Sequence, residues 1–316
     1  MSIVAGWVDV HGHFAPPTDE ETEWARWVAM RRECFLAPEP FRWSAEETLD
    51  YLDRTGVAMQ MLSNLPADHA ALRASNDYGA SLVAKHPRRF GLLAAVPTDD
   101  PDVALAEIDR ADRELHADGY AMTAAYNGVY LGDRRLEVVW AELDRRAATV
   151  FIHPNAYAPA ALGRPSPLVE VAFETARSVV DLLYAGVLRR HRQLRLVLAH
   201  AGGALPALSG RLQLLGTADW VPNPEGLTSE EIREHLARLY LDTAASGADS
   251  HLAPALTMVG RDHLVYGSDC GVPCSTETSM NANIELLHTS TVLHPGEVEH
   301  LGRCALDLFP RAASRL

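Results

Sequence analysis

Short apolar runs rich in β-branched residues recur along the chain, and the segments between them have the hydrophobic period of amphipathic helices. Two of the runs, LRLVLAH and TVFIHP, are almost continuously apolar, as expected of strands buried on both faces of a parallel sheet. Eight such runs are present, at Val4–Val10, Val57–Ser63, Phe90–Val96, Gly119–Ala125, Thr149–Ile152, Arg195–Ala199, Leu239–Thr243 and His263–Ser268. Eight strands that alternate with helices through right-handed crossovers predict an α/β fold, the closed (β/α)8 TIM-type barrel.

The helical segments begin and end with recognisable signals. Ser44, followed three residues later by Glu47, predicts a helix N-cap, and Gly56 predicts the end of that helix. An open doubly wound sheet is the alternative fold, but it usually has a glycine-rich phosphate-binding turn after its first strand, which VDVHGH is not. Two stretches exceed a minimal barrel. We expect Pro16–Arg42 to form an insertion over the barrel mouth, and the residues after Ser268 to add terminal helices.

Composition narrows the class of partner. The net charge is −14 without a basic stripe, which argues against nucleic acid or a membrane surface and favours a small molecule. MSIVAGWVDV lacks the pattern of a signal peptide, and no window holds about 18 uninterrupted apolar residues. A cytoplasmic protein with one domain over residues 1–316 is expected. The cysteines are few and scattered along the chain, so we expect them to be reduced thiols; they are Cys34, Cys270, Cys274 and Cys304.

Four of the predicted strands end in residues that can bind a metal, which matters because the active sites of such barrels lie at the C-terminal ends of the strands. His11 and His13 end the first strand, His153 the fifth, His200 the sixth and Asp269 the eighth. The two-residue period of a strand places both side chains of the His-x-His motif on one face. Imidazole and carboxylate suit zinc, iron or manganese, and three or four protein ligands plus a water make an open catalytic site.

Each of these histidines alone would more often be structural than a ligand, but their joint placement favours a metal site. The glycines beside them have an expected use as well. Gly12 would let the backbone pass close to the ion, and Gly202 and Gly203 would open space beside His200. The other histidines lie in helical or loop patterns, where solvated or structural roles are expected.

In this order, the segments VDVHGHF, FIHP, LVLAHAGGALP and LVYGSD resemble the amidohydrolase-related decarboxylases, among them the aminocarboxymuconate-semialdehyde, γ-resorcylate and 6-methylsalicylate decarboxylases. The resemblance covers nearly the whole chain. It implies one divalent ion, zinc or alternatively manganese, bound by His11, His13, His153 and Asp269. It also implies that His200 acts as acid and base close by, and that no organic cofactor is needed.

Two features of the sequence bear on that metal count. Binuclear relatives bridge two ions with a carbamylated lysine, whereas Lys85 is the only lysine here and lies in a helix-end pattern. Relatives usually have aromatic or bulky residues directly after the aspartate of the eighth strand, where this chain has Cys270 and, four residues on, Cys274. A second metal site at this pair is the alternative, but two further ligands are lacking nearby.

The same set of residues suits two reactions. One is non-oxidative decarboxylation of a small aromatic or unsaturated hydroxycarboxylic acid, in which Asp269 or His200 protonates the carbon that loses CO₂. The other is hydrolysis of an ester, lactone, amide or C–C bond by metal-bound hydroxide. The resemblance favours the lyase. A binding protein with a structural metal is a third hypothesis, although structural zinc is usually closed by four Cys or His ligands.

An assembly is also implied by the resemblance. Arg211, eleven residues after His200, matches an arginine that projects from one subunit into the neighbour's pocket, where it would bind the substrate carboxylate of a homodimer. The alternative is a surface arginine whose stem covers apolar neighbours in ALPALSGRLQLL. Arg32 and Arg42 are both candidates for a second substrate-binding arginine, from the insertion.

Overall fold

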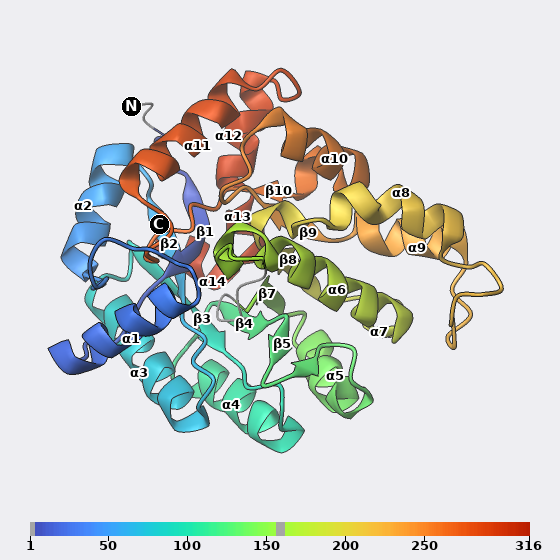
Figure 1. The fold of residues 1–316 in the computed structure, drawn as a ribbon, viewed down its shortest axis with the longest axis horizontal. Helices are drawn as coiled ribbons and strands as arrows, with labels where there is room; N and C mark the ends of the chain where they lie inside the picture. Colours follow the sequence, from blue (N-terminus) through green and yellow to red (C-terminus); the bar gives the residue numbers. More distant parts are fainter. Residues whose placement is uncertain (1–3, 156–161) are drawn as a thin grey trace.

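The computed structural model describes residues 4–155 and 162–316. Eight parallel strands follow one another in the order β1-β2-β3-β4-β7-β8-β9-β10. Their bounds are β1 Val8–His13, β2 Met59–Ser63, β3 Phe90–Ala95, β4 Gly119–Thr123, β7 Thr149–His153, β8 Arg195–Leu198, β9 Tyr240–Asp242 and β10 Leu264–Val265. Backbone hydrogen bonds from Val10 N to Tyr266 O and from Asp269 N to His11 O, both 2.9 Å, join the last strand region to the first. The sheet therefore closes, and the predicted (β/α)8 barrel is confirmed (Figure 1).

Helices surround the barrel (Figure 1). They are α1 Glu20–Arg32, α2 Ala45–Thr55, α3 His69–Lys85, α4 Pro101–Arg113, α5 Glu137–Arg145, α6 Glu170–Tyr184, α7 Val187–Arg190, α8 Leu205–Leu215, α9 Ser229–Ala237, α10 Asp249–Val259, α11 Glu277–Thr289, α12 Pro295–Arg303, α13 Ala305–Leu308 and α14 Pro310–Ala313. A short hairpin of β5 (Ala125–Tyr126) and β6 (Val129–Tyr130) follows β4. Ser44 accepts a hydrogen bond from Glu47 N at 3.3 Å, and Gly56 follows α2 with a φ of 83°, as predicted.

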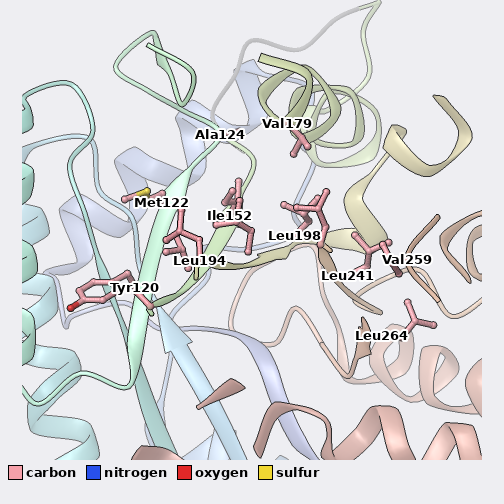
Figure 2. Packing of buried hydrophobic residues seen from close by; sticks show 14 of the residues in the cluster. Tyr120, Met122, Ala124, Ile152, Val179, Leu194, Leu198, Leu241, Val259 and Leu264 are labelled. Atoms are coloured by element: carbon pink, nitrogen blue, oxygen red, sulfur yellow. The ribbon is translucent and has the colours of Figure 1, made fainter. Parts of the chain in front are cut away.

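Two apolar layers hold the strands in place. One fills the barrel interior and is closed, at the N-terminal ends of the strands, by Leu308, Phe309 and Ala312 near the end of the chain. The other lies between the strands and the helices. Figure 2 shows part of this outer layer, including Met122, Ile152, Leu198 and Leu241 of four neighbouring strands with Val179 of α6 and Val259 of α10. Because apolar side chains cover both faces, the strands read as continuous apolar runs in the sequence.

The first and last strands differ from the predicted bounds. β1 begins at Val8 instead of Val4, because the backbone N–H groups of Val4 and Gly6 donate to carbonyl oxygens at the end of α2 and Gly6 turns the chain at a φ of 81°. At its other end, β1 continues to His13. The predicted run His263–Ser268 contains only the two-residue strand β10, since the chain is in a 3-10 turn just before it.

The insertion after β1 contains one exposed helix. None of the α1 side chains is buried, and Trp24 is 57% exposed. Its attachments are polar: Trp27 Nε1 donates to Ala37 O at 2.8 Å, and Arg42 pairs with Glu23. Figure 1 shows α1 on the side of the molecule formed by α2 and α3.

At the other end of the chain, the expected terminal helices are α11 to α14. Among the described residues, no helix is both long and apolar enough to cross a bilayer.

Candidate metal centre

An irregularity in β1 aims both histidines of the His-x-His motif into the barrel. The register between β1 and β2 shifts between Asp9 and Gly12, which breaks the strict alternation of the strand. Val10 packs in the interior layer, and the next residue, His11, also faces inward, with its ring 4.9 Å from that of Phe151. His13 follows on the same side, so that the Nε2 atoms of His11 and His13 are 3.0 Å apart.

Gly12, between the two histidines, has a different use from the one expected. A Cβ at this position would lie 2.3 Å from the side chain of Gln60 on β2. The missing side chain therefore makes room for Gln60, and the expected approach of the Gly12 backbone to an ion is not what requires glycine here. Gly203 is similar: a Cβ there would lie 2.2 Å from the carbonyl oxygen of Ala172, so its absence admits the backbone of the α6 segment instead of opening space beside His200.

Residues from three further strand ends converge around this pair. Asp269 Oδ1 lies 3.1 Å from His11 Nε2 and 3.2 Å from His13 Nε2. The His153 ring is 4.8 Å from that of His13, and His200 Nε2 is 3.9 Å from Asp269 Oδ2. All five residues predicted from the strand ends are thus brought together at the C-terminal side of the barrel.

This cluster is a metal-binding site. In the described part of the chain, His11, His153, His200 and Asp269 each offer a ligand atom, and these atoms all lie within 4.8 Å of one another. His13 lies beside the group through its contact with Asp269. Imidazole nitrogens and a carboxylate oxygen that converge in a buried space form a donor set suited to a transition-metal dication.

The electrostatics of the cluster favour the metal-binding forms of His13, His153 and Asp269, and they favour a positive charge at His11. Burial lowers the pKa of His13 and holds the pKa of His153 well below its usual range, so both imidazoles are neutral at neutral pH. Burial raises the pKa of Asp269, but His11, His13 and His200 outweigh this effect and hold it well below its usual range. Burial lowers the pKa of His11, while Asp242 and Asp269 outweigh it and raise the value to about 10. A positive charge is therefore favoured between these two carboxylates, and a dication supplies one.

Asp242, which the sequence reasoning did not single out, orients the site from behind. Its Oδ2 accepts a hydrogen bond from His11 Nδ1 at 2.7 Å, and in the neutral imidazole this bond leaves the lone pair on Nε2, which faces the centre. Its Oδ1 accepts from the backbone N–H of His200 at 2.7 Å and from Ala244 N at 3.0 Å. Asp242 ends the strand β9, so the rule that found the other four strand ends also applies to the segment YLDTA.

A second buried carboxylate ties the two strands of the barrel seam together. Asp9 Oδ1 accepts from the backbone N–H groups of His11 and Ser268, both at 3.0 Å. Its Oδ2 accepts from Gln60 Nε2 at 2.7 Å and from Ser268 Oγ at 2.5 Å. Burial raises the pKa of Asp9 to about 6 against the opposing effect of these bonds. Asp9 thus fixes the backbone on both sides of the cluster.

Two residues of the cluster have strained backbones. His200 and Asp269 are non-glycine residues with φ of 55° and 62°, and Ala201 has φ of 53°. Such left-handed conformations cost about 1–3 kcal/mol each and persist where surrounding contacts enforce them. Here the bonds from His200 N to Asp242 and from Asp269 N to His11 O provide that enforcement.

The three arginines that the sequence analysis names as candidates for substrate binding lie on the surface. Arg211 is exposed on α8, and it has no ion pair with any residue in 4–155 or 162–316. Arg32 is exposed at the end of α1, and Arg42 is 64% exposed and held by both carboxylate oxygens of Glu23. The structure therefore does not bring an arginine of the insertion onto the metal centre.

All four cysteines are free. Burial raises the pKa of Cys270 to about 12, so its thiol stays protonated at neutral pH and is a poor metal ligand. Cys274 Sγ lies 3.9 Å from Asp269 Oδ2. Within the described ranges, the group of possible metal ligands contains neither residue.

Comparison with known proteins extends over most of the chain. A decarboxylase of Aspergillus niger, yanB, is 31% identical over 335 aligned residues, which cover 96% of this chain and 87% of the relative. The 6-methylsalicylic acid decarboxylase acuB of Aspergillus aculeatus is 36% identical over 256 aligned residues, with 78% and 77% covered.

Solved structures have the same fold. A 2,6-dihydroxybenzoate decarboxylase in complex with 2,6-dihydroxybenzoate matches with a TM-score of 0.79 at 22% identity, covering 97% of this chain and 99% of the other. A dihydroxybenzoic acid decarboxylase from Polaromonas sp. JS666, with bound manganese and an inhibitor, matches with a TM-score of 0.76 at 21% identity, and 97% of each chain is covered. The amidohydrolase family model matches residues 8–297. The resemblance expected from the sequence is confirmed, and the chain belongs to the amidohydrolase family.

Proposed function

We propose that this protein is a metal-dependent decarboxylase of a small aromatic hydroxycarboxylic acid. The observation on which this rests is the buried convergence of imidazoles with one carboxylate at the C-terminal ends of the barrel strands. The relative at 31% identity is a decarboxylase and the relative at 36% identity is a 6-methylsalicylic acid decarboxylase, and these names favour the lyase over the hydrolase, for which the same residues would serve.

We assign His11, His13, His153 and Asp269 as the ligands of one divalent ion, with zinc first and manganese second. A single ion is favoured because Lys85, the only lysine, lies exposed at the end of α3 and precedes the N-terminal end of β3, whereas a bridging carbamate would have to come from a C-terminal strand end. Manganese is bound in the Polaromonas enzyme, which makes it the natural comparison in a reconstitution. When bound, the ion supplies Lewis-acid polarisation of the substrate's carboxylate and neighbouring hydroxyl.

The protein's own residues must then deliver one proton. Loss of CO₂ from a carboxylate leaves its electron pair on the ring carbon, which takes up a proton to give the product. Asp269 Oδ1 faces His11 and His13, so Oδ2 is the oxygen left for proton transfer, and His200 Nε2 lies 3.9 Å from it. Either Asp269 or His200 delivers the proton, and the other restores it.

One experiment separates the competing functions. Protein reconstituted with zinc or manganese is incubated with hydroxybenzoates, including 6-methylsalicylate and 2,6-dihydroxybenzoate, and with simple aryl esters and lactones. We expect CO₂ release from a hydroxybenzoate, one ion per chain by elemental analysis, and loss of activity after chelation. Release of acid from the esters without CO₂ would establish the hydrolase, and two ions per chain at full activity would defeat the single-ion assignment.

The proposed substrate contact at Arg211 requires a second copy of the chain. Arg211 is exposed on α8 together with Leu214, which is 79% exposed, and Trp220 just beyond the helix is 71% exposed. An arginine among exposed aromatic and aliphatic side chains is typical of protein interfaces. We therefore propose a homodimer in which Arg211 of one subunit pairs with the substrate carboxylate in the other.

Arg211→Ala is expected to raise the KM for a carboxylate substrate about tenfold or more while leaving the metal content unchanged, because it removes one charge-assisted contact. Arg113→Ala, which changes an exposed arginine on α4, is the matched control and should have no effect. At a substrate concentration well below the raised KM, mixing Arg211→Ala with His200→Ala subunits should restore activity, since a mixed dimer contains one complete site. Full activity in a monomer, or no recovery after demonstrated subunit exchange, would contradict the proposal.

A further inference from the structure

The loop after β10 places a serine hydroxyl on the oxygen of Asp269 that the histidines of β1 leave free. Ser275 Oγ donates a hydrogen bond to Asp269 Oδ2 at 2.7 Å. The other oxygen, Oδ1, is the one that faces His11 and His13. The two oxygens of this carboxylate are therefore distinguished by their partners.

Ser275 is itself firmly held. Its backbone N–H donates to Val272 O at 3.2 Å, which closes a turn of the loop. The next residue, Thr276, is the N-cap of α11 and forms a capping box with Ser279. Because these contacts hold the backbone at Ser275 and at the residue after it, the Ser275 hydroxyl can define the rotation of the carboxylate to which it donates.

We infer that Ser275 is a positioning residue, which fixes the rotation of the Asp269 carboxylate so that Oδ1 binds the metal and Oδ2 is presented for proton transfer. This inference rests on the proposed function for its catalytic consequence, but its geometric part concerns only Asp269 and the ion. Without the hydroxyl, the carboxylate could turn to bring both oxygens toward the ion, which would withdraw Oδ2 from the substrate.

The neighbourhood of Ser275 also provides a conservative variant. Ser275 lines a cavity of about 310 Å³ between α2, the end of the insertion and this loop, with Trp43 and Tyr51 among the other lining residues. The additional methyl group of Ser275→Thr therefore has space, while the hydroxyl is kept. Cys274→Ala is the matched control, because Cys274 is the adjacent residue in the same loop and its thiol, at 3.9 Å from the same oxygen, is only a weak hydrogen-bond donor.

The test uses two readouts on the full chain. In protein loaded with Co²⁺, the visible absorption spectrum reports the coordination of the ion without any substrate. Ser275→Ala should change this spectrum, whereas Ser275→Thr and Cys274→Ala should keep the wild-type spectrum. With a substrate that the wild type decarboxylates, Ser275→Ala should lower kcat about tenfold at an unchanged KM and metal content. Ser275→Thr, which keeps the hydroxyl, should have a kcat close to that of the wild type.

The outcomes are distinct. A wild-type spectrum and kcat in Ser275→Ala would overturn the inference, and so would equal effects of Ser275→Ala and Cys274→Ala, which would mean that the loop and not the hydroxyl matters. Failure of Ser275→Thr to recover the spectrum, in a variant with wild-type circular dichroism, would also overturn it. If no acid is decarboxylated by the wild type, the proposed function fails, but the Co²⁺ spectra still decide the role of Ser275.

Discussion

His200→Ala is expected to lower kcat about 10²–10⁴-fold while one ion per chain is retained, because general acid and base groups contribute rate factors of this size. The His200 side chain is 15% exposed, its Nδ1 has no hydrogen-bond partner among the described residues, and its Nε2 points toward Asp269 Oδ2 at 3.9 Å. An imidazole at the open edge of the cluster is well placed to exchange a proton with substrate or with Asp269.

The same variant decides whether His200 is a ligand. Its ring nitrogen lies within reach of the same centre as those of His11 and His153, so the geometry alone permits coordination. The measurement is metal content by elemental analysis alongside kcat. Loss of the ion together with activity would make His200 a ligand, and loss of neither would remove it from the mechanism. His251→Ala, at an exposed position of α10, is the control and should leave both unchanged.

Asp242→Asn is expected to weaken metal affinity about 10–100-fold, the usual effect of removing the partner that orients a metal-binding histidine. The carboxylate receives the Nδ1 proton of His11 at 2.7 Å. An amide NH₂ in its place would donate to Nδ1, which would move the proton of His11 to Nε2 and occupy the lone pair needed by the ion. The amide oxygen could still accept from His200 N, so the backbone would keep its anchor.

The measurement is a competition titration with a coloured chelator, together with thermal unfolding of the metal-free protein to show that the fold survives. Asp249→Asn is the matched control, since Asp249 accepts hydrogen bonds from Ser290 and Thr291 far from the centre. Unchanged affinity in Asp242→Asn, or an equal loss in Asp249→Asn, would contradict the orienting role.

The barrel and the cluster of ligands could be predicted from the sequence because both depend on local patterns. Strands covered on two faces are continuously apolar, and the barrel brings every strand end to one side, so residues as distant as His11 and Asp269 could be placed together without any contact information. The family resemblance then supplied the roles that we propose for these residues.

Other features depend on contacts that no local pattern contains. The register shift in β1, which turns Val10 and His11 to the same side, arises where β1 meets β2 and has no signature in VDVHGH itself. The use of Gly12 depends on a side chain of another strand, and the partner of His11 lies 231 positions away at Asp242. The observed lengths of the first and last strands also differ from the predicted lengths, because turns at Gly6 and before Leu264 interrupt apolar runs without changing their hydrophobicity.

The seam between the first and last strand regions has a consequence for folding. It is closed by the bonds of Asp9 to Ser268, which are 259 positions apart, and by the backbone bond from Asp269 to His11. Contacts of such large sequence separation require closure of the longest loop in the chain, and they slow folding. The proposed ligands come from both sides of this seam, so a bound ion would cross-link the two ends of the barrel. Since an ion that binds only the folded state stabilises it by mass action, metal supply would determine the fraction of the protein in the closed barrel as well as the fraction that is active.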